Sequence, residues 1–237
     1  MKIIFSLMLL SLLIGFGACS PNTEALLLKG KALLEEEKYV QAVTYLDSVI
    51  KQQPGWGSAY HMRAVAYFEQ QSYEQAIADF SRAIQLDSTS YKNYYYRGNA
   101  YQEVEAYQNA LADYDIATRL NPQLKGPYIN RGVVFYMLGA YQEALQSLNQ
   151  AYQLDSSDEQ ILLNRAKTNI ALQNGQAALE DLQLLAATKP ESAEIFYLLG
   201  IAYLQNQQKD EGCSVWLKAE NLGSKRALEA MEKYCKG

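Results

Sequence analysis

The segment from Tyr91 to Leu124, YKNYYYRGNAYQEVEAYQNALADYDIATRLNPQL, sets the pattern for most of this chain. In its first half, Tyr94, Gly98 and Tyr101 recur at spacings of three and four residues. This spacing places their side chains on one face of an α-helix. We therefore predict a helix that turns one stripe of bulky and small side chains toward a neighbour.

The second half of the segment predicts a second helix. Ala110, Tyr114 and Ala117 again follow helical spacing, and a short polar break around Glu105 separates them from the first stripe. Pro122 ends the second helix, because its ring excludes helical geometry at the residue before it. The segment is therefore a helical hairpin.

The same hairpin recurs along the chain at steps of thirty-four residues. Small residues occupy the Gly98 position in every step: Gly30, Ala64, Gly98, Gly132, Ala166 and Gly200. Large residues occupy the Tyr114 position in every step: Leu46, Phe80, Tyr114, Leu148, Leu182 and Trp216. We expect Gly98 to face Ala110, so that the two helix backbones approach closely and the large residue fills the remaining space.

This pattern resembles the tetratricopeptide repeat, whose 34-residue signature is W-x2-L-G-x2-Y…A-x3-F…P. Here it stands as Tyr94-x2-Arg97-Gly98-x2-Tyr101…Ala110-x3-Tyr114…Pro122, with arginine in place of the leucine. The resemblance implies an all-α fold, a right-handed α-solenoid of about six helical hairpins whose first helices form the inner face. The expected units span residues 23–56, 57–90, 91–124, 125–158, 159–192 and 193–226, and a capping helix follows at 224–236.

The start of the chain has the composition of an export signal. Lys2 precedes an apolar run that ends in small residues before Cys19. The run is short for a membrane-spanning anchor, the alternative, which needs about 20 apolar residues. Gly17-Ala18-Cys19 resembles the cleavage box of bacterial lipoproteins, which implies a signal peptide at 1–18, a lipid on Cys19 and a short tether at 19–22. Ser20 then favours the outer membrane, facing the periplasm.

Composition excludes several classes of function. The net charge is −5 and the basic residues are scattered, which argues against a nucleic-acid partner. His61 is the only histidine, so we expect no metal site and no histidine-based catalysis. The glycines fall at repeat positions and form no phosphate-binding loop. We predict a protein without enzymatic activity and without a cofactor.

Two further cysteines lie near the end of the chain. Cys213 falls in the second helix of the last hairpin and Cys235 at the end of the capping helix, with the turn midway between them. In an antiparallel helix pair they lie at the same height, so a disulfide is predicted for an exported protein. The alternative is a pair of free thiols.

The arginines that replace the signature leucine are paired in the sequence with an acidic residue. Asp79, Asp113 and Asp181 each follow such an arginine by sixteen residues, whereas Ser147 follows Arg131 at the same distance. We predict an ion pair within the hairpin at the first three sites. The alternative is a charge row that binds a ligand.

The inner face is the candidate binding site. Its inward positions should be the second, fifth, ninth and twelfth of each unit, and they mix aromatic, amide and basic side chains. Such a groove suits an extended peptide or a helix. We single out five groove residues: His61, Lys92, Tyr95, Asn99 and Tyr136. Tyr95 stands where some relatives clamp a C-terminal carboxylate with lysine, so that clamp is excluded.

Three functions are compatible with these patterns. The first is a lipid-anchored scaffold of the bacterial cell envelope that binds another protein or peptide in its groove. The second is a structural subunit of an envelope complex that assembles through its outer edges or terminal hairpins. The third is a regulator or carrier for an enzyme.

Overall fold

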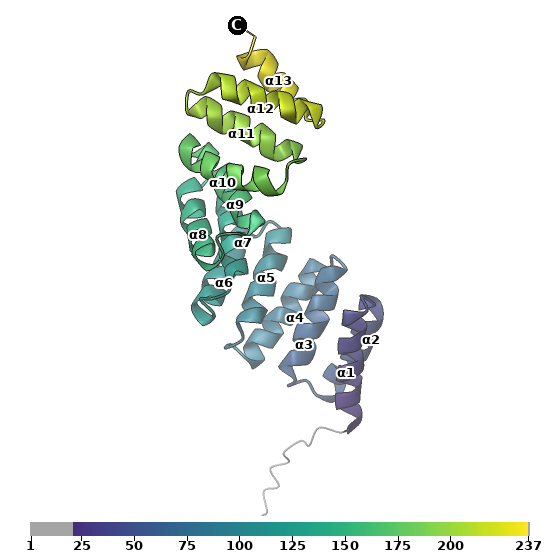
Figure 1. The fold of residues 1–237 in the computed structure, drawn as a ribbon. Helices are drawn as coiled ribbons and strands as arrows, with labels where there is room; N and C mark the ends of the chain where they lie inside the picture. The colour runs from purple at the N-terminus through teal and green to yellow at the C-terminus, as the bar shows by residue number, and fades with distance from the viewer. Residues whose placement is uncertain (1–20, 237) are drawn as a thin grey trace, which may run out of the picture.

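The computed structural model describes residues 21–236, so the predicted signal peptide and Cys19 lie outside the described residues. Thirteen helices and no strand occupy that range (Figure 1). They are α1 Pro21–Glu35, α2 Tyr39–Gln52, α3 Gly57–Glu69, α4 Tyr73–Leu86, α5 Tyr91–Glu103, α6 Tyr107–Leu120, α7 Lys125–Met137, α8 Tyr141–Leu154, α9 Glu159–Ala171, α10 Gly175–Thr188, α11 Ala193–Gln205, α12 Lys209–Asn221 and α13 Lys225–Tyr234.

The helices form six hairpins that stack in chain order. Each helix packs on the next one in sequence, and each first helix also contacts the first helix of the following hairpin. Within residues 21–236 no comparable contact links the second helices. The first helices therefore lie closer together and line the inner side of an α-solenoid. Figure 1 shows the hairpins side by side along an elongated body, with α1 at one end and α13 at the other.

The contact between a small and a large residue closes each hairpin, as predicted. A Cβ atom added at Gly98 would lie 2.7 Å from Cε1 of Tyr114, and one at Gly132 would lie 2.7 Å from Cγ of Leu148. Tyr114 and Leu148 are fully buried. At these two hairpins the glycine is required, because any side chain would displace the core residue that crosses it.

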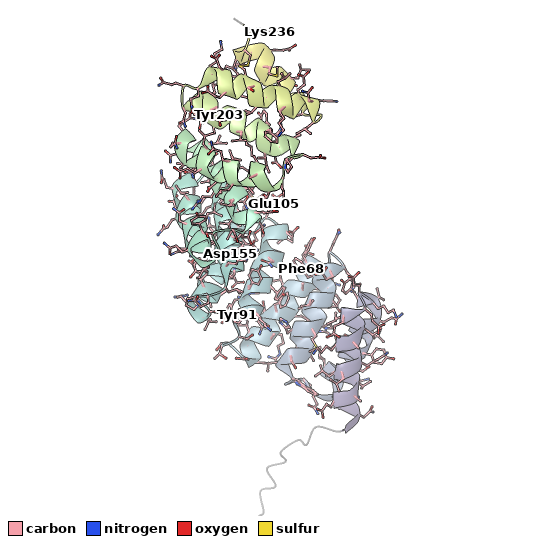
Figure 2. All side chains as sticks on the ribbon, in the orientation of Figure 1. Phe68, Tyr91, Glu105, Asp155, Tyr203 and Lys236 are labelled. Carbon is pink, nitrogen blue, oxygen red and sulfur yellow. A yellow bond between two sulfur atoms is a disulfide. The ribbon has the colours of Figure 1, made fainter. Side chains whose placement is uncertain are left out.

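The turn inside each hairpin has the same backbone conformation. The predicted break falls at Glu105, which is labelled in Figure 2. Its φ is 57°, in the left-handed region. The next residue, Ala106, donates its N–H to the Tyr101 carbonyl at 2.8 Å, a bond that caps the first helix. The equivalent residues of the other hairpins also have positive φ: Glu37, Gln71, Gly139, Gln173 and Gln207.

The repeated arginines form the predicted ion pairs inside the hairpins. Nε and Nη2 of Arg97 each donate to an Asp113 carboxylate oxygen at 2.8 Å. Arg63 and Arg165 make the same two-bond contact with their own aspartates, Asp79 and Asp181. Arg131, which lacks an aspartate, donates instead to Ser147 Oγ at 3.1 Å. This confirms the structural interpretation of these arginines.

Each arginine also has a partner that the repeat pattern does not predict. Its Nη1 donates to a residue sixteen positions upstream, on the second helix of the preceding hairpin. The four upstream partners are Asp47 for Arg63, Ser81 for Arg97, Asp115 for Arg131 and Asn149 for Arg165. One guanidinium therefore joins three helices and ties neighbouring hairpins together on the side of the second helices.

Burial makes the Arg97–Asp113 pair costly to break. The Asp113 side chain is 4% exposed and that of Arg97 is 18% exposed. Burial raises the pKa of Asp113, while the hydrogen bonds and charge of Arg97 act against this rise. A carboxylate in this position has no access to water once its cation is removed.

The C-terminal helix covers the last hairpin. Ser224 caps α13 by accepting the N–H of Ala227 at 3.3 Å. A disulfide joins Cys213 of α12 to Cys235, with a Cα–Cα distance of 5.9 Å. Leu228 of this helix is 43% exposed. Only Ala227 of this helix is fully buried.

The arginine pairs predict unequal effects of two equivalent substitutions. Arg97→Leu restores the signature leucine but leaves Asp113 buried without its cation, which should cost about 3–5 kcal/mol. The matched control Arg131→Leu leaves no buried carboxylate behind: Asp115, its charged partner, is 55% exposed to water, and the Ser147 hydroxyl still donates to the Glu143 carbonyl. The control should cost about 1–2 kcal/mol, which urea unfolding of both variants will measure. Equal losses would contradict the ion-pair interpretation.

Candidate functional site: the inner groove

We call the inner face of α3, α5, α7 and α9 the groove. The structure places the predicted residues along it: His61 on α3, then Lys92, Tyr95 and Asn99 on α5, and Tyr136 on α7. They do not share one pocket. Three shallow hollows follow one another along the groove, and each contains at least one predicted residue.

The first hollow contains His61 and Lys92 and has a volume of about 340 Å³. Nδ1 of His61 donates to Oδ1 of Asn93 at 2.7 Å. Its ring packs edge-on against Phe80 and Tyr96, with centroids 5.6 and 5.7 Å apart. His61 is thus partly a packing residue between α3 and α5, and Nε2 is the atom it has left for a partner.

The middle hollow is lined by amides and has a volume of about 150 Å³. Its walls are Phe68, Asn99, Gln102, Glu103 and Asn130. Phe68 lies near the C-terminal end of α3 (Figure 2). Nδ2 of Asn130 donates to Oδ1 of Asn99 at 2.8 Å and so joins α7 to α5. The hollow combines one aromatic face with several hydrogen-bonding groups.

Tyr95 packs its own hairpin against the next one. Its ring centroid lies 5.4 Å from that of Tyr96 and 6.3 Å from that of Tyr114. A Cβ added at Gly126 would lie 2.8 Å from the Tyr95 hydroxyl, so the tyrosine fits only because glycine begins this part of α7. Tyr95 therefore packs between α5 and α7, and it lines none of the three hollows.

The third hollow is more apolar and also measures about 150 Å³. Val133, Tyr136 and Leu148 line it, together with Lys167. Tyr136 is 37% exposed and packs against Tyr141 with ring centroids 5.3 Å apart. Lys167 is paired with Glu194 at 2.8 Å, so its charge is already neutralised.

Sequence reasoning missed two features of the groove. Met137 and Leu138, which follow Tyr136 in the sequence, are apolar and 57% and 44% exposed. The signal for them is a change along the repeat, since Glu35, Glu69 and Glu103 occupy the Met137 position in the three preceding hairpins. The other missed feature is Tyr114, whose hydroxyl reaches the amides of the middle hollow.

The chemistry available in the groove is that of binding. Among residues 21–236 no group of three or more histidine, cysteine, aspartate or glutamate side chains is arranged to hold a metal ion. Amides supply donors and acceptors, and the aromatic and aliphatic residues supply apolar contact area. This combination favours a polypeptide ligand.

The environment of His61 generates a pH prediction. Burial lowers the pKa of His61 from its ordinary value of 6.5, the bond to Asn93 opposes this, and the charge of Lys92 adds to it. Between the lowered pKa and 6.5 the unfolded chain binds more protons than the folded one, so stability should fall as pH drops below about 6.5. Because His61 is the only histidine, one imidazole NMR resonance reports its pKa.

His61→Gln is the control for this titration, since it keeps a polar side chain but removes the titrating group. The variant should lose the decline in stability that begins near pH 6.5. An NMR pKa at or above 6.5 in the folded wild-type chain would contradict the buried position of the ring.

Comparison with known proteins agrees with this architecture. A TPR repeat model matches residues 64–104, and two tetratricopeptide repeat models match residues 24–55 and residues 95–159 with 163–216. The model that matches residues 95–159 and 163–216 covers half of the chain. No curated protein matches this sequence.

Solved structures share the fold at low sequence identity. YrrB, described as a TPR protein with an unusual peptide-binding site, is 22% identical over 79% of this chain and 97% of its own, with a TM-score of 0.73. PilF of Pseudomonas aeruginosa is 19% identical over 89% of this chain and 97% of its own, with a TM-score of 0.74.

A third similar structure is a tetratricopeptide repeat protein from Parabacteroides merdae. It is 16% identical over 90% of this chain and 97% of its own, with a TM-score of 0.65. These likenesses concern the fold, and the matched sequence models concern the family. The chain belongs to the tetratricopeptide repeat family.

Proposed function

We propose that this protein is a non-enzymatic scaffold of the bacterial cell envelope that holds another protein or peptide in its groove. The tetratricopeptide repeat fold supports protein–protein interaction in general. The observation that supports binding in the groove is the lining of the groove itself. Exposed Tyr136 lines the third hollow, and the amides of Asn99, Gln102 and Asn130 line the middle one.

The composition of the groove favours a polypeptide partner. Tyr95 and Tyr136 offer large contact areas with little side-chain entropy to lose, and amides can bond to a peptide backbone. The peptide-binding site described for YrrB, which has the same fold, supports the same assignment. The net charge is −5 and the basic residues are scattered through the sequence, which argues against a nucleic-acid partner.

The position of the protein at a membrane is the second part of the proposal. We propose cleavage after residue 18, lipidation of Cys19 and an outer-membrane location facing the periplasm. No helix between residues 21 and 236 is long and apolar enough to cross a bilayer. Helix α1 begins at Pro21, so a lipid on Cys19 would hold the first hairpin close to the membrane surface.

An alternative function uses the end of the solenoid in place of the groove. Leu28 and Val40, on the first hairpin, are 62% and 70% exposed, the two highest values among the large hydrophobic side chains of the described range. In this alternative they contact a neighbouring subunit in an envelope complex, and the groove has no ligand.

Alanine substitutions separate the two functions. The triple variant Tyr95→Ala, Asn99→Ala and Tyr136→Ala should lose at least about tenfold in partner recovery after cross-linking in cells, because three groove contacts are removed. The matched control is Leu28→Ala with Val40→Ala, which should recover the partner as the wild type does. Loss in the control and retention in the triple variant would overturn the groove proposal, provided that both variants keep their melting temperatures.

The anchor is tested by replacing its cysteine. Cys19→Ala should abolish incorporation of radiolabelled palmitate and move the protein from the membrane to the soluble fraction, because no acyl chain remains to hold it. The control is the double variant Cys213→Ser with Cys235→Ser, which should still incorporate the label and still fractionate with the membrane. A wild-type protein without label, or a Cys19→Ala variant that keeps the label, would contradict lipidation of Cys19.

A further inference from the structure

We propose that the buried hydroxyl of Tyr114 orients the amides of Asn99, Gln102 and Asn130 to bind the backbone of an extended peptide segment. The inference rests on the proposed function, since it names the class of ligand that the groove accepts. It also assigns a positioning role to a residue that does not line the groove.

Tyr114 is the only tyrosine among the six large residues that close the hairpins. The others are Leu46, Phe80, Leu148, Leu182 and Trp216. Its ring crosses Gly98 with no room for a Cβ, as the leucine does at Gly132. The phenol oxygen then extends beyond the packed ring and reaches the inner face of α5, where it meets Asn99 and Gln102.

The hydrogen bonds of this cluster leave defined groups available. The Tyr114 hydroxyl lies 3.0 Å from Asn99 Oδ1 and 2.9 Å from Gln102 Oε1, and it has one proton to donate. Asn99 Oδ1 also accepts from Asn130 Nδ2 at 2.8 Å. The Asn99 carbonyl therefore accepts from Asn130 and shares the single Tyr114 proton with the Gln102 carbonyl, and the Asn99 NH2 has no protein partner in residues 21–236.

The same accounting applies to the two neighbouring amides. The NH2 of Gln102 and the carbonyl of Asn130 also have no protein partner in the described range, and both residues line the middle hollow with Asn99. The hollow therefore presents two NH2 donors and one carbonyl acceptor, fixed from beneath by a side chain that is fully buried. A peptide unit offers the complementary carbonyl and N–H.

Charge and geometry decide between the possible ligands. A C-terminal carboxylate is disfavoured, because Glu103 lines the same hollow and no lysine or arginine does. A bound helix is disfavoured as well, because its backbone groups already bond to one another. An internal, extended segment leaves its N–H and C=O groups free for the amides, as in other modes of backbone recognition.

The test uses short peptides and a single-atom change in the peptide backbone. Short peptides are selected from a random displayed library on the full chain, and those that lose binding to the Tyr95→Ala, Asn99→Ala, Tyr136→Ala variant are kept. Each backbone amide is then replaced in turn by an ester, which removes one N–H and weakens one carbonyl acceptor. We expect one or two positions at which the ester lowers affinity about tenfold.

Tyr114→Phe is the decisive variant, because phenylalanine occupies the equivalent position at Phe80 and keeps the packing. It should lower peptide affinity about tenfold and reduce the ester effect to less than about threefold, with the melting temperature nearly unchanged. Tyr101→Phe, which removes a hydroxyl elsewhere on α5, should change neither quantity.

The outcomes distinguish this inference from the proposed function. Groove-dependent peptides whose ester effects persist in Tyr114→Phe would overturn the role of Tyr114 and leave the groove function standing. Groove-dependent peptides that bind as helices or through their C-terminal carboxylate would overturn the extended-backbone assignment. Failure to select any groove-dependent peptide would count against both proposals.

Discussion

The fold depends on one repeated contact, in which a large side chain of the second helix lies directly on a small residue of the first. Tyr114 on Gly98 shows how tight the contact is, since a single Cβ at Gly98 would overlap the ring. This contact fixes the distance between the two helix backbones of a hairpin. Because the hairpins are alike, each one stacks on the next in the same way, and the first helices come together along one side.

Because the first helices gather on one side, the two faces of the solenoid have different chemistry. On the side of the second helices, each arginine is committed to its own hairpin and to the preceding one, so its charge is fully used within the protein. On the inner side, the amides of the middle hollow and the exposed ring of Tyr136 remain available. The array is thus held together on one side, and the inner side is the one that our proposal assigns to a partner.

Much of the fold follows from the sequence, since the period, the small and large positions and the arginine–aspartate pairs are all local or nearly local patterns. Ser224 as a helix cap follows from local chemistry too. The upstream partners of the arginines could not be predicted, because they depend on how one hairpin is rotated against another. For the same reason, the sequence could not predict how the inner-face residues divide among three hollows. The sequence distinguishes Tyr114 from its equivalents only as a tyrosine where they are leucine, phenylalanine or tryptophan.

The most direct measurement of the central claim is site-specific photo-cross-linking in the native envelope. A benzoylphenylalanine at Tyr95, in the groove, is compared with one at Leu184, which is 53% exposed on the second-helix side. The binding role of the groove predicts a discrete cross-linked partner from Tyr95 and none from Leu184. A partner captured from Leu184, with none from Tyr95, would contradict it.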